Sequence, residues 1–159
     1  MRDFEEFFAS SARPLRRTAY GLVGDWDRAE DLTQAAFVRL YRHWDRIQDV
    51  NVEAYARRVL VNLYIDERKF AAEVPTDVLP ERGRADEDRS TSIDIGRALA
   101  TLPRQARAVI VLRYLDDRPV AEVAEVLGIA EGTVKSHTHR GMSALSALLS
   151  PATELRSLT

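Results

Sequence analysis

Five residues between positions 55 and 69 are spaced so that one side of a helix would carry all of them: Tyr55, Arg58, Asn62, Asp66 and Lys69. Steps of three and four residues bring side chains together on a helix. An aromatic ring can stack on a base, amide and carboxylate groups can bond base edges, and cations can neutralise phosphates. The stripe therefore predicts a site for a separated nucleic-acid strand, and a solvated helix face is the alternative that the pattern alone leaves open.

A second candidate site is an interval without carboxylates between positions 131 and 154. Its charged and hydrogen-bonding side chains include Lys135, Ser136, His137, His139 and Arg140. All of these except His137 are expected on the face opposite Val134 and Thr138, because a helix repeats every ~3.6 residues. Cations can contact phosphates there and polar groups can contact base edges. An ordinary solvated helix is the competing interpretation.

The residues before this interval favour a helix-turn-helix. Pro119 suits the start of a short helix, and Ala124 is small where a second helix must approach. Gly128 suits the left-handed turn that would end the first helix. A longer helix is then expected from Glu131, preceded by Ala130, which lacks the capping oxygen of Ser or Thr. The second helix of this motif enters the major groove of DNA, so the pattern predicts duplex binding.

A third set, Glu30, Asp31, Gln34 and Phe37, lies beside an apolar stripe near the N-terminus. The stripe itself is Ala29, Leu32, Ala36, Leu40, Trp44 and Ile47, which predicts one helix over 27–47. Acidic and amide groups next to an exposed Phe37 would suit a basic helical partner. The alternative is a solvated face with Phe37 in the core.

Other apolar positions also repeat at helical spacing. Ala56, Val59, Leu60 and Leu63 predict a second helix, and two more helices are expected on either side of Pro103. Phe4 to Leu22 predicts two short helices or one helix interrupted at Pro14. No segment alternates long enough to predict a strand, so the expected fold is all-α.

Enzyme chemistry is not indicated. The chain has no cysteine and lacks the phosphate-loop, zinc-protease and nucleophile-elbow motifs. His137 and His139 are two residues apart on a helix, which is a poor spacing for a metal pair. We expect a non-enzyme without metal or cofactor.

Composition separates the chain into two blocks. The 159 residues suit one medium or two small domains, and the net charge of -2 gives no overall nucleic-acid signal. Positions 71–93 hold six acidic and three basic residues with two prolines and no apolar period, which favours a flexible linker over an ordered surface loop. The expected organisation is a helical domain over 1–70, a linker over 71–93, a second domain over 94–150 and a tail over 151–159. No apolar run reaches the ~20 residues of a membrane span, and the acidic start is unlike a signal peptide, so we expect a cytoplasmic protein.

Three segments resemble bacterial extracytoplasmic-function (ECF) sigma factors, among them the actinobacterial SigE-like group. Residues 127–136, LGIAEGTVKS, with the leucine-proline start at Leu102, are similar to region four. Residues 29–37, AEDLTQAAF, are similar to the region-two helix that docks on RNA polymerase. Residues 56–62, ARRVLVN, together with Asp66, are similar to the promoter-melting segment.

The resemblance implies a function for each set. Glu30, Asp31, Gln34 and Phe37 would bind the clamp helices of the polymerase largest subunit. The minus-ten set would capture unpaired bases and comprises Tyr55, Arg58, Asn62, Asp66, Arg68 and Lys69. The minus-thirty-five set would read duplex DNA and comprises Glu131, Gly132, Thr133, Lys135, Ser136, His139 and Arg140. The implied partners are core RNA polymerase, promoter DNA and an anti-sigma factor, without membrane insertion.

Some positions depart from the family pattern. Tyr55 replaces a usual Trp, Val61 a frequent Arg, and Thr138 a usual large apolar residue. Two other classes of protein remain as alternatives. A stand-alone helix-turn-helix regulator would not need the stripe that begins at Tyr55, and a helical adaptor would not need the acid-free interval.

Overall fold

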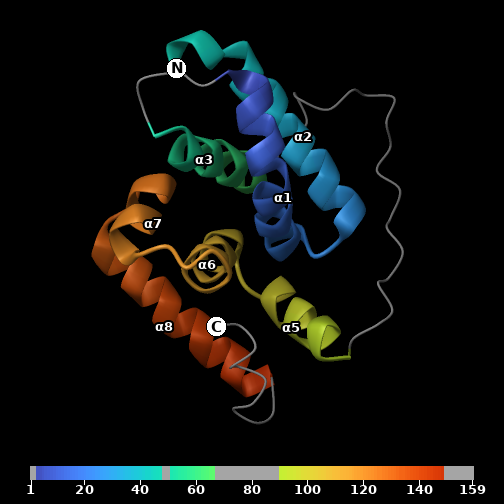
Figure 1. Cartoon of the computed structure of the whole chain (residues 1–159). Helices are drawn as coiled ribbons and strands as arrows, with labels where there is room; N and C mark the ends of the chain where they lie inside the picture. The colour runs from blue at the N-terminus through green and yellow to red at the C-terminus, as the bar shows by residue number, and fades with distance from the viewer. Residues whose placement is uncertain (1–2, 48–50, 67–89, 149–159) are drawn as a thin grey trace. The chain divides into compact units, whose positions relative to one another are not determined.

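The computed structural model describes residues 3–47, 51–66 and 90–148, with side chains from residue 95 in the last range. Helices make up these ranges and no strand occurs in them, so the predicted all-α class is confirmed (Figure 1). The chain forms two compact units, Met1–Gly83 and Arg84–Thr159. The predicted pair of helical domains is therefore confirmed, while most of the predicted linker and the whole tail 151–159 lie outside the described residues.

The first unit contains α1 (Phe4–Val23), α2 (Trp26–Arg42), a 3₁₀ turn (Trp44–Arg46) and α3 (Val52–Ile65). Helices α1 and α2 pack side by side, and α3 packs against both (Figure 1). Each helix begins at a side chain that caps its free amides. The caps are Asp3, which accepts from the Glu6 amide, Asp25, which accepts from Asp27 and Arg28, and Asn51, which accepts from Ala54.

Two boundaries in this unit differ from the expected ones. Helix α1 continues through Pro14 without interruption. A proline removes one backbone hydrogen bond, but buried residues on both sides, Ser11 and Leu15 among them, keep the helix packed. The helix predicted over 27–47 ends at Arg42, and the 3₁₀ turn then brings Ile47 back into the core, where it is buried.

The second unit contains α5 (Ser90–Ala100), α6 (Arg104–Ile110), a π-helical turn (Val111–Leu115), α7 (Val120–Leu127) and α8 (Glu131–Leu148). Helices α5, α6 and α7 all pack on α8. Because α5 begins at Ser90, the last four positions of the segment assigned to the linker are helical. Ala98, Leu99, Ile110 and Leu145 form the centre of this core.

The turn between α7 and α8 has the conformation that the sequence predicts. Gly128 has a φ of 67°, in the left-handed region, and its amide bonds back to the Ala124 and Glu125 carbonyls. The amide of Ile129 also bonds to the Ala124 carbonyl, at 3.0 Å. Together these bonds end α7 and direct the chain into α8, which completes the helix-turn-helix.

Replacing Gly141 by alanine should destabilise the second unit. A Cβ at Gly141 would lie 3.0 Å from both Cδ1 and Cγ1 of Ile110, which is completely buried. Overpacking of this kind costs ~1–3 kcal/mol, more than the ~1 kcal/mol that alanine gains in helix propensity. We expect a lower free energy of unfolding in urea for Gly141→Ala. The control is Gly96→Ala in α5, where an added Cβ meets nothing within 4 Å and stability should rise; equal stability of Gly141→Ala and the parent would contradict the packing argument.

Candidate DNA- and protein-binding surfaces

The exposed side of α3 carries three of the six predicted minus-ten residues. Arg58 is exposed and Tyr55 and Asn62 are partly exposed, whereas Ala56, Val59, Leu60 and Leu63 are buried against the rest of the domain. The structure therefore brings Tyr55, Arg58 and Asn62 onto one accessible side of an anchored helix. Such a surface can present an aromatic ring, a cation and an amide to a nucleic-acid strand.

Asp66 was expected on the same helical stripe as Tyr55 and Asn62, but it lies just beyond the end of α3. The helix ends at Ile65, and Asp66 follows as the C-cap in an extended conformation, so it does not continue a regular helical stripe. Its amide bonds to the Asn62 carbonyl at 2.9 Å, which keeps Asp66 one turn from Asn62. Arg68 and Lys69 lie outside the described residues. Val61 is completely buried, so the departure from the family pattern at this position does not reach the surface.

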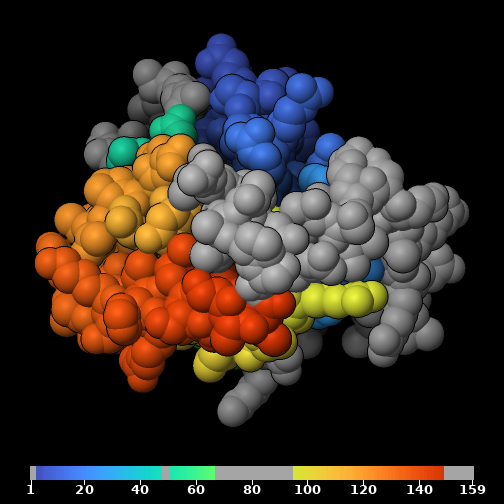
Figure 2. All heavy atoms as spheres, turned by 90° about the horizontal axis from the view of Figure 1, so that it is seen from below, coloured from blue at the N-terminus to red at the C-terminus, as the bar shows by residue number. Residues whose placement is uncertain are grey.

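Helix α8 separates its buried and exposed residues as predicted. Val134, Gly141 and Leu145 are buried, and the exposed residues include Glu131, Gly132, Lys135, Ser136, His139 and Arg140. Thr133 is partly exposed at the same end. The atoms of α8, orange to red, lie at the surface of the second domain in Figure 2. This face combines two cations with hydroxyl and imidazole groups, which can contact phosphates and base edges.

Two polar residues of α8 have structural partners. The Thr138 hydroxyl donates to the Val134 carbonyl at 2.8 Å, which satisfies a polar group at a position where an apolar one is usual. Nε2 of His137 lies 3.1 Å from Oε1 of Gln105, and this bond links α8 to α6. Burial, and secondarily the charge of Arg140, lower the pKa of His137. The lowered pKa favours the neutral form of His137, and its side chain joins α8 to α6.

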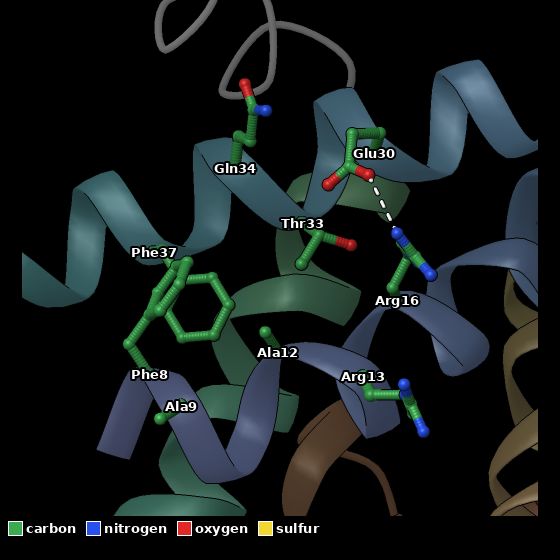
Figure 3. Close-up of a pocket in the computed structure, with 9 residues that line it drawn as sticks. All are labelled: Phe8, Ala9, Ala12, Arg13, Arg16, Glu30, Thr33, Gln34 and Phe37. Carbon is green, nitrogen blue, oxygen red and sulfur yellow. Dashed lines mark hydrogen bonds and ion pairs between the residues drawn. The ribbon is translucent and has the colours of Figure 1, made fainter. Parts of the chain in front are cut away.

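The groove between α1 and α2, which we call the α1–α2 groove, contains three of the four predicted polymerase-binding residues. It has a volume of about 340 Å³ and is lined by Phe8, Ala9, Ala12, Arg13, Arg16, Glu30, Thr33, Gln34 and Phe37 (Figure 3). Phe8 and Phe37 lie together at one end (Figure 3). At the other end a guanidinium nitrogen of Arg16 lies 3.1 Å from Oε2 of Glu30. The groove thus offers an apolar end and a charged end to a partner.

The expectation of an exposed Phe37 is wrong. Only 5% of Phe37 is exposed, because the aromatic residues near the start of α1 cover it. Its ring lies 4.7 Å from Phe8, 6.1 Å from Phe7 and 6.2 Å from Phe4, measured between centroids. The accessible aromatic residue of the groove is instead Phe8, which is 46% exposed. The sequence pattern did not predict Phe8, Arg13 and Arg16 as part of this groove, because they come from α1 and their only signal is the amphipathic pattern of that helix.

Asp31 is partly buried on α2, outside the groove lining. Burial raises the pKa of its carboxyl group, and the nearby Asp27, Glu30 and Asp25 raise it further, while Arg28 opposes them. The carboxylate is therefore less stable in the folded protein than in water. Removing this charge should stabilise the first domain.

We accordingly expect Asp31→Asn to raise the free energy of unfolding at pH 7, by an amount on the order of a few tenths of a kcal/mol, as for other surface charges. The folded-state pKa of Asp31 is above the unfolded value, so the folded protein takes up the proton first as pH falls. The advantage of the variant should shrink as pH falls through the raised pKa and vanish below the ordinary value of ~3.9. Urea unfolding at a series of pH values measures this difference. A difference that is constant with pH would show that the charge of Asp31 is not its cause.

Within the described residues, no helix combines the length and the apolar composition that a membrane span requires. Across 3–47, 51–66 and 90–148, no three His, Asp or Glu residues are grouped so that they could hold a metal ion.

Comparison with known proteins matches both domains to one family. Residues 7–72 match the model of sigma-70 region 2, and residues 92–145 match that of sigma-70, region 4. The chain is 38% identical over 151 residues to the RNA polymerase sigma-E factor of Streptomyces coelicolor, covering 90% of this chain and 84% of that protein. It is 33% identical over 153 residues to the ECF RNA polymerase sigma factor SigW of Bacillus subtilis, covering 82% and 80%.

Solved structures show the same fold. The sigma factor RpoE of Bartonella quintana, in complex with the anti-sigma factor NepR, matches with a TM-score of 0.71 and 25% identity, covering 93% of this chain and 97% of that chain. CnrH, in complex with the cytosolic domain of CnrY, matches with a TM-score of 0.69 and 25% identity, covering 91% and 86%. These matches extend over both helical domains in the order that the sequence predicts. The chain therefore belongs to the ECF group of the sigma-70 family and is an RNA polymerase sigma factor.

Proposed function

We propose that this sigma factor binds core RNA polymerase through the α1–α2 groove and reads promoter DNA with one surface of each domain. The α3 surface captures unpaired bases of the minus-ten element. The exposed face of α8 reads the minus-thirty-five element as duplex, through the major groove. The protein acts where the polymerase is, in the cytoplasm, and has no chemistry or cofactor of its own.

The observation that carries this proposal is the one-sided distribution of residues on α8. The buried residues Val134 and Leu145 attach one face of the helix to α5, α6 and α7, and the opposite face presents Lys135 and Arg140 without a carboxylate after Glu131. A helical adaptor has no need of this arrangement. A stand-alone regulator would need it, but would not need the α3 surface.

The two DNA-reading surfaces work together because one chain carries both. Once the first domain is bound to polymerase, the second contact becomes effectively intramolecular, so two weak interfaces give a useful affinity. The net charge of -2 agrees with weak binding of promoter DNA by the free protein. We assign the tether to segment 71–89, which precedes α5 and is acidic by composition.

An anti-sigma factor is the second protein partner that we propose. Both structural relatives named above were solved as complexes, RpoE with the anti-sigma factor NepR and CnrH with the cytosolic domain of CnrY. The α1–α2 groove, with exposed Phe8 at one end and the Arg16–Glu30 pair at the other, is suited to an amphipathic helix of such a partner. Competition between polymerase and the inhibitor for this groove would keep the sigma factor inactive.

Run-off transcription with purified core polymerase tests the proposal. The full chain should start specific transcripts, whereas a regulator or an adaptor should start none. A variant that lacks residues 94–159 should lose its dependence on the upstream element and still bind polymerase. Complete loss of polymerase binding by this variant would place the docking surface in the second domain. Promoter binding by the free protein as tight as that of the holoenzyme would contradict the proposed role of polymerase.

A further inference from the structure

Helix α8 contains two glycines, Gly132 and Gly141, and each needs a physical reason. Glycine is less favourable than alanine inside a helix because it loses more backbone freedom on folding. Gly141 has such a reason, since a Cβ there would lie 3.0 Å from Ile110. The close packing of α8 on α6 therefore requires a glycine at this position.

No corresponding reason exists for Gly132 within the part of the chain that the structure describes. A Cβ added to Gly132 would meet no atom within 4 Å. Its backbone is helical, unlike that of Gly24 and Gly128, which have positive φ angles. Neither packing nor a turn accounts for this glycine, so the free space beside it is available to a partner.

The position of Gly132 on the helix identifies the side from which that partner comes. Gly132 lies two residues before the buried Val134, ~200° around the helix, and therefore faces away from the core. It lies three residues before Lys135 and four before Ser136, so all three residues share one exposed face. Gly141 lies nine residues further on, which is ~180° around the helix axis from Gly132, and it faces the core. The two glycines of α8 thus face opposite sides.

We propose that Gly132 is the point of closest approach between α8 and promoter DNA, where the duplex occupies the space that a Cβ would fill. The inference deepens the proposed reading of the minus-thirty-five element and rests on it. The occupant is duplex DNA because the shared face carries Lys135, Ser136 and Arg140 and no carboxylate follows Glu131 there. The N-terminal residues of a recognition helix contact base edges in the major groove, and Gly132 is the second residue of α8. Any side chain at Gly132, even a methyl group, separates the two surfaces.

The test compares Gly132→Ala with Gly96→Ala in the full chain. Gly96 is also helical and also open, since an added Cβ there meets nothing within 4 Å, but it lies on α5. Both variants should stabilise the second domain, seen as roughly two- to fivefold slower exchange of the α8 amide hydrogens. Only Gly132→Ala should weaken binding of the holoenzyme to a promoter with the upstream element, by roughly 10- to 100-fold. On a promoter whose upstream element is scrambled, Gly132→Ala should bind as the parent does.

Each failure has its own signature. Unchanged promoter binding by Gly132→Ala, with a parent that depends on the upstream element, would overturn the inference and leave the proposed function intact. Faster amide exchange in Gly132→Ala would also overturn it, because the glycine would then have a role inside the folded protein. A parent holoenzyme that ignores the upstream element would overturn the proposed function itself.

Discussion

Initiation from a duplex promoter should fall on the order of 100-fold when Asn62 and Asp66 are both replaced by alanine. Removing a base from its stack costs a few kcal/mol, and a site that accepts the base must offset this cost. The Asn62 side chain is partly exposed on α3, and Asp66 follows one turn later. The backbone amide of Asp66 donates a hydrogen bond to the Asn62 carbonyl, which holds Asp66 in this place. Because each 1.4 kcal/mol changes an equilibrium tenfold, losing both polar groups leaves most of the unstacking cost unbalanced. Run-off transcription and the permanganate reactivity of unpaired thymines measure the loss.

A promoter that is already unpaired across the minus-ten element provides the control for this variant. Since the unstacking cost is then met in advance, the double variant should recover a large part of its activity. Neither substitution removes a buried apolar group, so thermal unfolding and binding to core polymerase should be unchanged. Equal opening of duplex promoters by variant and parent would show that α3 does not form the base-binding site.

The neighbouring arginines of α3 offer a matched pair for the same surface. Arg58 is exposed on the side of Tyr55 and Asn62, whereas Arg57 lies ~100° further around the helix and is less exposed. Alanine at Arg58 should weaken strand capture and make the loss of activity with salt less steep, because one contact between a cation and a phosphate is removed. Alanine at Arg57 should have the smaller effect of the two, because it leaves the exposed stripe intact.

Local signals in the sequence were sufficient to predict the helix ends at the turn of the helix-turn-helix. Gly128 predicts the left-handed turn, and the turn appears at that residue with a φ of 67°. The start of α8 at Glu131 also agrees with the prediction. The continuity of α1 through Pro14 and the end of α2 at Arg42 were not predicted. Both depend on contacts between helices, and a single-helix pattern does not contain them.

The candidate surfaces show the same distinction: one could be predicted from the pattern of a single helix, and another depends on how two helices pack. The exposed face of α8 follows from charge and period alone, because its cations and its buried residues lie on opposite sides of one helix. The α1–α2 groove does not follow from period, since Phe8 and Arg16 on one helix meet Phe37 and Glu30 on another. Helical spacing places Phe37 at the border of the apolar stripe of α2. Only the packing of α1 decides that it is buried.

The burial of Phe37 leads to a second large effect. Phe37→Ala should lower the free energy of unfolding of the first domain by ~3–5 kcal/mol, the usual cost of removing a buried aromatic ring. The side chain is 5% exposed and packs against three phenylalanines of α1, so its loss leaves a cavity between α1 and α2. Urea unfolding of the full chain, followed by hydrogen exchange in α2, measures the change. Any loss of polymerase binding by this variant should be in proportion to the fraction of its molecules that are unfolded.

Phe8→Ala is the control that separates packing from docking. Because Phe8 is 46% exposed, its removal should cost only ~0.5–1.5 kcal/mol of stability, about the value of an aromatic pair. If the α1–α2 groove binds polymerase, however, Phe8 is the aromatic side chain that the partner meets, and Phe8→Ala should weaken binding to core polymerase by ~10-fold. A variant with nearly parental stability and weak binding would locate the docking surface at this groove. Parental binding by Phe8→Ala would instead restrict docking to the exposed polar side of α2, where Gln34 lies.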